Sequence, residues 1–137
     1  MSLIRRVVIS KLKERQNFNA PPLSDLKELL SLYNNKNFVA AKSAAVSITK
    51  KFPKHEFAWK VLGAILKSQG QLTEALSANK IAYEIAPKDL EVLNNLTDTY
   101  LKLNLLEEAE LLCRESIAIN YNVAATHNNL GNILQEF

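Results

Sequence analysis

Hydrophobic side chains recur at helical spacing along most of the chain, and breaks in the pattern divide it into pairs of helices. In residues 56–89 the first stripe consists of four large apolar residues, Trp59, Leu62, Ile65 and Leu66. A second stripe begins at Leu72 and ends at Ile85, and Gly70 stands between the two as a stop signal. This order predicts a helix, a short turn and a second helix.

The next window repeats this scheme. Asp89 has the side chain of a good N-cap for a first helix, and a second helix is expected from residue 105 to residue 119. Asn104 stands where Gly70 stood, and Asn tolerates the left-handed backbone conformation better than most residues. The turn of this window is therefore expected to have the same shape as the turn before it.

The first window, residues 22–55, follows the scheme more loosely. Ser24 is the expected cap of its first helix, residues 34–37 form the turn, and residues 38–51 form the second helix. Equivalent positions in successive windows lie 34 residues apart, as in Ala41, Ala75 and Ala109, in Leu62, Leu96 and Leu130, and in Trp59, Leu93 and His127. Self-similarity at this period is typical of stacked repeats.

Small residues have a packing reason in this pattern. The alanine shared by the three windows is expected to face Gly63 in the second window, so that the two helix backbones of one unit approach closely.

With these residues in view, the chain resembles the tetratricopeptide repeat family. The window 56–89 keeps six positions of that family's pattern: Trp59, Leu62, Gly63, Ala75, Ala82 and Pro87. The resemblance implies an all-α solenoid, a right-handed superhelix of antiparallel helix pairs, with about three repeats and one extra helix. We expect an N-terminal segment at 1–21 and a repeat array at 22–137, divided into 22–55, 56–89, 90–123 and a partial unit at 124–137.

Composition and single residues argue against chemistry in this chain. No apolar run approaches the roughly 18 residues that cross a bilayer, and the single cysteine, Cys113, excludes a disulfide framework and fits a buried position. Neither His55 nor His127 has a ligand partner at metal-binding spacing. We therefore expect a cytoplasmic protein that is not an enzyme, with no cofactor, no metal and no small-molecule substrate.

Charge is distributed unevenly. Residues 1–55 carry 11 basic and 3 acidic side chains, a net charge of +8, whereas residues 56–137 carry 6 and 11, a net charge of −5. A solvated lysine-rich face explains this asymmetry, and so does an anionic partner or head-to-tail contact between copies. Nucleic acid is not expected as a partner, because arginine is scarce after Arg15 and no aromatic and basic stacking motif is present.

Both ends of the chain raise alternatives. Residues 1–20 place Ile4, Val7, Val8 and Leu12 at helical spacing among basic residues, which indicates a short basic amphipathic helix. Docking on the first repeat or on a second copy, or disorder, is favoured over a membrane surface or a transit peptide, because Pro21 and Pro22 separate the segment from the array. At the other end, Leu130, Ile133, Leu134 and Phe137 lack a cover, which indicates a longer protein or pairing between two copies.

The concave surface is the expected functional site, since stacked helix pairs form a groove lined by the first helix of each unit. The groove is expected to begin apolar, with Leu23, Leu26 and Leu30, and to become rich in amides. Its candidate binding residues are Lys60, Lys67, Glu91, Asn94, Asn95, Asp98, Lys102, Asn128, Asn129 and Asn132. The expected partner is a protein or an extended peptide.

Asparagines one period apart suggest how such a peptide is held. The segments 93–96 and 127–132, which contain Asn95 and Asn129, resemble the repeats that precede the catalytic region of O-GlcNAc transferases and related bacterial transferases. In that family such asparagines hold extended polypeptide, because an amide both donates and accepts hydrogen bonds. The alternative function is therefore recruitment of substrate, or oligomerisation, for a larger glycosyl- or sulfotransferase-like enzyme. Wet polar positions on a helix explain these asparagines equally well.

Overall fold

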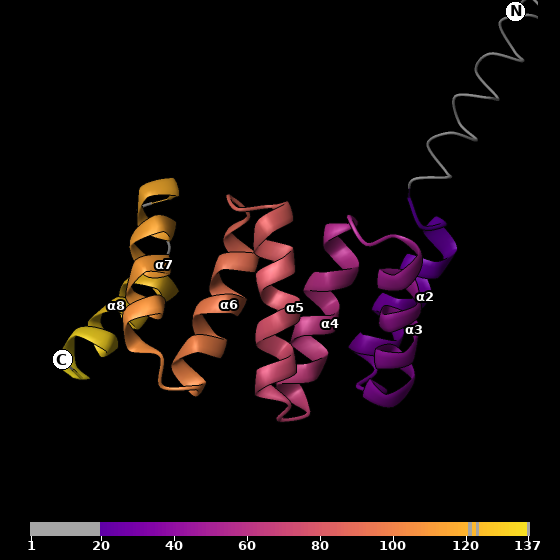
Figure 1. Cartoon of the computed structure of the whole chain (residues 1–137), viewed down its shortest axis with the longest axis horizontal. Helices are drawn as coiled ribbons and strands as arrows, with labels where there is room; N and C mark the ends of the chain where they lie inside the picture. The colour runs from indigo at the N-terminus through magenta and orange to yellow at the C-terminus, as the bar shows by residue number, and fades with distance from the viewer. Residues whose placement is uncertain (1–19, 121, 123, 137) are drawn as a thin grey trace, which may run out of the picture.

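The computed structural model describes residues 20–120, 122 and 124–136, and this part of the chain consists of α-helices and turns without a strand. The helices follow one another in a row, each antiparallel to the last (Figure 1). They are α2 (Leu23–Asn34), α3 (Phe38–Lys51), α4 (Glu56–Ser68), α5 (Leu72–Ile85), α6 (Leu90–Lys102), α7 (Leu106–Ile119) and α8 (Ala124–Glu136). The prediction of an all-α solenoid is confirmed. The expected helix in residues 1–20 lies outside the described residues, apart from Ala20.

Three turns share one backbone conformation, with a left-handed residue at the same place. Lys36, Gly70 and Asn104 occupy equivalent places, and their φ angles are 60°, 75° and 59°. The left-handed conformation predicted for Asn104 is confirmed, whereas Lys36 adopts it without the small side chain that normally favours it. The turn shape therefore belongs to the repeat and not to the residue that fills it.

Helix starts follow the capping expectations in part. Asp89 caps α6, since its Oδ1 accepts a hydrogen bond of 2.9 Å from the backbone N–H of Glu91. The expectation for Ser24 is wrong, because α2 begins at Leu23 and its cap is Pro22, which offers no side-chain acceptor. The backbone carbonyl of Pro22 instead accepts from the N–H of Asp25 at 3.0 Å.

The helices form two layers. Contacts between successive units run from α2 to α4 and from α4 to α6, so these first helices form an inner layer. The second helices α3, α5 and α7 pack between them on the other side as an outer layer. Because the inner helices reach one another, the inner layer is the concave side of the array.

Gly63 lies against a buried side chain of α5. The alanines Ala41, Ala75 and Ala109 are fully buried, in keeping with close packing inside each unit. A Cβ on Gly63, however, would overlap the side-chain amide of Asn79, whose Cγ lies 2.8 Å from that position. The glycine therefore makes room for a buried amide on α5, the helix that also carries Ala75.

That amide ties α5 to α6. Asn79 is 2% exposed, and its Nδ2 donates a hydrogen bond of 3.0 Å to the Oγ1 of Thr99. The Thr99 hydroxyl donates in turn to the backbone carbonyl of Asn95 at 2.9 Å. A buried polar group is tolerated only when it is bonded, and this chain of bonds meets that requirement.

The last helix is better covered than expected. Ile133 is fully buried and packs with Ala109 and Cys113, so the expectation that it is uncovered is wrong. Leu134, on the same helix, is 48% exposed, and Phe137 lies outside the described residues. Cys113 is buried as expected, and burial raises the pKa of its thiol.

Candidate functional site

Two adjoining hollows lie on the inner layer and share Leu30 and Phe57. The first has a volume of about 250 Å³ and is lined by Leu23, Leu26, Lys27, Leu30 and Phe57. The second has a volume of about 190 Å³, and α2, α4 and α6 all contribute to it. Its lining residues are Leu30, Tyr33, Phe57, Lys60, Val61, Ala64, Lys67, Glu91 and Asn95. We call these two hollows together the concave groove.

The groove is apolar at its α2 end. Leu23 is 66% exposed and Leu30 is 42% exposed, although both are large aliphatic residues. Tyr33 is held in place by a tilted contact with Phe38, with ring centroids 5.9 Å apart. Exposed aliphatic side chains that line a hollow are typical of a binding surface, because their burial by a ligand is favourable.

A lysine hub forms one wall of the second hollow. The Nζ of Lys60 lies 2.8 Å from a carboxylate oxygen of Glu91, 3.0 Å from Asp89 and 3.7 Å from Glu56. The Lys60 side chain is only 16% exposed. Burial by itself lowers the pKa of Lys60, but its hydrogen bonds to Glu91 and Asp89 and their charges outweigh burial and raise it.

Two carboxyl groups around Lys60, those of Glu56 and Asp89, also interact with each other. A hydrogen bond with Glu56, followed by bonds from Lys60 and the Val92 N–H, lowers the pKa of Asp89 to about 2. The same bond, with burial and the charge of Asp89, raises the pKa of Glu56. On acidification the proton therefore goes to Glu56 first, and Asp89 keeps its charge and its bond to Lys60.

This arrangement predicts a pH-dependent effect of Asp89→Asn. The asparagine keeps the cap of α6 but removes the charge opposite Lys60, so we expect a loss of about 1 kcal/mol in the free energy of unfolding at pH 7. Because the folded pKa of Asp89 is depressed, its contribution is present above the unfolded pKa and is lost as the pH falls through about 2. Urea unfolding of the variant and the unmodified chain at pH 7 and pH 2 measures the difference in their free energies of unfolding. The same difference at both pH values would contradict the depressed pKa of Asp89.

A second ion pair continues along the same wall. The Nζ of Lys67 lies 2.8 Å from a carboxylate oxygen of Asp98, and Lys102 lies 3.7 Å from that same oxygen. Lys67 belongs to α4 and Asp98 to α6, as Lys60 and Glu91 do. Lys60 and Lys67 thus join α4 to α6.

The structure brings only some of the predicted groove residues together. Four of them line the second hollow: Lys60, Lys67, Glu91 and Asn95. Asp98 and Lys102 extend its wall through their ion pairs, and Asn94 is exposed on α6. The remaining three, Asn128, Asn129 and Asn132, lie on α8 and line neither hollow.

Sequence reasoning missed what the groove lysines contact. The pair Glu56 and Lys60, four residues apart on a helix, is the one local signal that could have found the hub. It also missed a cleft on the outer layer, which is described below.

The part of the chain that the structure describes has neither a cluster of metal ligands nor a membrane-spanning helix. No three His, Cys, Asp or Glu side chains within it come close enough to hold a metal ion. None of its helices is both long enough and apolar enough to cross a bilayer.

Comparisons with known proteins agree with this architecture. Residues 90–120 match the family model of the tetratricopeptide repeat. The structure is similar to the first tetratricopeptide repeat domain of Spaghetti (RPAP3) bound to an HSP90 peptide, with a TM-score of 0.79, 14% identity, and coverage of 83% of this chain and 90% of that one. It is also similar to the Sgt2 tetratricopeptide domain of Aspergillus fumigatus, with a TM-score of 0.76, 16% identity, and coverage of 85% and 81%.

A third similar structure is the type III secretion chaperone SycD of Yersinia enterocolitica with a peptide of the translocator YopD, with a TM-score of 0.76, 14% identity, and coverage of 82% and 92%. Sequence comparison with curated proteins gives no match. These findings show a helical solenoid with the tetratricopeptide repeat fold, in which residues 90–120 match the repeat by sequence. They do not show the finer resemblance to the repeats of O-GlcNAc transferases.

Proposed function

We propose that the chain is a binding scaffold that holds an extended segment of a partner protein in the concave groove. The observation that carries this proposal is the continuity of the groove, in which an apolar hollow opens into a polar one across Leu30 and Phe57. The Spaghetti and SycD structures contain bound peptides on the same fold, which supports the proposal.

The groove's contacts indicate which segment fits. The first hollow takes an aliphatic or aromatic side chain, since Leu23, Leu26 and Leu30 line it. Asn95, at the far wall of the second hollow, supplies an amide that both donates and accepts hydrogen bonds and therefore suits a peptide backbone. Asn129, one repeat further along, extends this recognition along the peptide.

Charge contributes less to recognition than the sequence suggested. Lys60 and Lys67 are each already paired with carboxylates of α6, so a ligand carboxylate competes with Glu91 or Asp98 for them. Breaking such a pair leaves a partly buried charge without its partner, which is costly. We therefore expect the second hollow to select side chains and backbone without a net negative charge, and not an acidic terminus.

The test starts from a displayed library of random twelve-residue peptides, selected on the immobilised full chain. Enriched peptides are synthesised with a fluorescent label, and anisotropy gives their dissociation constants. Leu30→Asn should weaken binding about tenfold, because it replaces an exposed leucine that both hollows share. Asn95→Ala together with Asn129→Ala should weaken it about fivefold and leave helicity unchanged.

Leu111→Asn is the matched control, since Leu111 is also exposed, at 65%, but belongs to α7 of the outer layer. Binding by this variant should equal that of the unmodified chain. A selection that enriches no peptide, or a Leu30→Asn variant that binds as tightly as the control, would rule out the groove as the binding site.

A further inference from the structure

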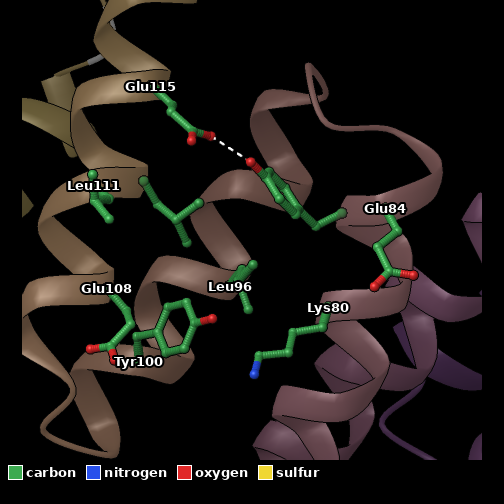
Figure 2. A pocket seen from close by; sticks show the side chains of 9 residues that line it. Lys80, Glu84, Leu96, Tyr100, Glu108, Leu111 and Glu115 are labelled. Carbon is green, nitrogen blue, oxygen red and sulfur yellow. Dashed lines mark hydrogen bonds between the residues drawn. The ribbon is translucent and has the colours of Figure 1, made fainter.

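A separate cleft opens on the outer layer, between α5 and α7, with α6 as its floor (Figure 2). Its volume is about 330 Å³, larger than either hollow of the concave groove. Leu96 and Tyr100 of α6 lie at its base, and Leu111 stands on the α7 side. The cleft therefore offers an apolar surface on the side of the molecule that the proposed peptide does not use.

Three carboxylates surround this apolar surface. Glu84 comes from α5, and Glu108 and Glu115 come from α7 (Figure 2). Glu115 accepts a hydrogen bond of 2.8 Å from the Tyr83 hydroxyl, which raises the pKa of that tyrosine. Within the described residues, Glu84 and Glu108 form no salt bridge.

One cation lines the cleft. The Nζ of Lys80 lies 6.0 Å from the centroid of the Tyr100 ring, at the edge of the range for a cation–π contact. Against three carboxylates it leaves the lining with a net charge of −2. The cleft therefore suits a segment whose apolar side chains are flanked by several cations.

The acidic lining is particular to this place in the array. The residues 34 positions before Glu84, Glu108 and Glu115 are Lys50, Glu74 and Ile81. Only one of these three equivalent positions is therefore acidic. The residue 34 positions before the exposed Leu111 is Ser77. Neither the exposed Leu111 nor the cluster of three glutamates is therefore a general feature of the repeat.

The chain itself carries a segment of matching chemistry. Residues 1–19 contain five basic side chains and one acid, a net charge of +4, and place Ile4, Val7, Val8 and Leu12 at helical spacing. We propose that this segment of one copy binds the outer cleft of a second copy. Its aliphatic residues cover Tyr100 and Leu111, and its arginines and lysines pair with the three glutamates.

The charge along the array favours a second copy over the same molecule. Residues 20–55 carry six basic and two acidic side chains, and exposed Lys50 and Lys51 lie at the end of the outer helix α3. In Figure 1 the helices α3 and α5 lie between α2, where the described chain begins, and the cleft of the same molecule. A neighbouring molecule can present its cleft without repulsion from these lysines.

Contact of this kind joins different surfaces of the two molecules, so it extends head to tail. Self-association should therefore grow with protein concentration and weaken as salt screens the charges. Sedimentation velocity on the full chain at low and high salt measures this dependence.

The decisive test mixes two forms of the full chain. One carries a nitroxide on Ser10→Cys, with Cys113 protected by its burial, and the other is labelled with nitrogen-15 and has no nitroxide. Amide signals of Glu84, Leu111 and Glu115 should lose intensity in the mixture. Attenuation centred on the concave groove, or no attenuation at any site, would overturn the proposal. So would attenuation that appears only in a sample whose molecules carry both labels and not in the mixture.

Charge reversal supplies the matched control. Glu84→Lys with Glu108→Lys should abolish the attenuation and raise the dissociation constant of self-association at least about tenfold. Glu74→Lys with Glu107→Lys makes the same change in net charge at exposed positions that do not line the cleft, and should leave both readouts nearly unchanged. Equal loss in the two double variants would mean that net charge alone drives association, and would also overturn the proposal.

Discussion

Gly63→Ala should lower the free energy of unfolding by about 2 kcal/mol and the melting temperature by about 8 °C. An alanine in an exposed helix interior normally stabilises, yet here the added methyl overlaps the amide of Asn79. That amide cannot move aside easily, because it is buried and donates to Thr99. Either α4 moves away from α5, or the bond between α5 and α6 breaks. Thermal unfolding followed by circular dichroism measures the loss.

Two further variants identify the cause. Gly131→Ala is the matched control, since no atom lies within 4 Å of a Cβ built there, and it should be neutral or stabilise by up to about 1 kcal/mol. Asn79→Ala removes the clashing amide, so Gly63→Ala should cost much less in that background. If Gly63→Ala destabilises equally with and without Asn79, the amide is not the reason for the glycine.

Ile133→Asp should raise the rate at which Cys113 reacts with a thiol reagent by at least about 100-fold. Ile133 is fully buried against Cys113 and Ala109, and a carboxylate cannot stay in that apolar contact. A 100-fold change corresponds to about 2.7 kcal/mol lost from the docking of α8. Because the sequence contains one cysteine, the absorbance of the released thiolate reports on this site alone.

Leu134→Asp places the same charge next along α8, on a side chain that is already 48% exposed. It should leave the reaction rate within about threefold of the unmodified chain. Circular dichroism should show that most of the helix content survives in both variants, since units of a repeat array contact only their neighbours. An unchanged rate in Ile133→Asp would mean that α8 does not seal the array.

Local physics made much of the fold predictable from the sequence. The period of 34 residues and the helical stripes give the order of the helices, and Asp89 and Asn104 behave as their side chains suggest. Ser24 shows where local reasoning fails, because a good capping residue lies one position beyond the actual start of α2. Boundaries of this kind depend on how the helix packs and not only on its own residues.

Contacts between units were harder to predict. Asn79 carries no local signal of its role, and only the position of α6 shows that Thr99 is there to bind it. The same holds for Lys60, whose partners Asp89 and Glu91 lie 29 and 31 residues further along the chain, at the cap and in the first turn of α6. The alternation of helices is set within each unit, whereas these polar ties depend on the spacing between units.

The two layers of the array are thus suited to different partners. The concave groove is lined first by aliphatic side chains and then by paired charges and an amide. The outer cleft combines an exposed leucine with three carboxylates. The exposed residues Leu30 and Leu111 separate the two surfaces experimentally, because each lines one and not the other.

The most direct test of the groove as the binding site is a titration of the nitrogen-15-labelled chain with a peptide from the random library. The largest chemical-shift changes should fall on α2, α4 and α6, at Leu30, Ala64 and Asn95. At the same peptide concentration they should be clearly smaller in Leu30→Asn and unchanged in Leu111→Asn. Changes centred on Leu111 and the outer helices would contradict the account.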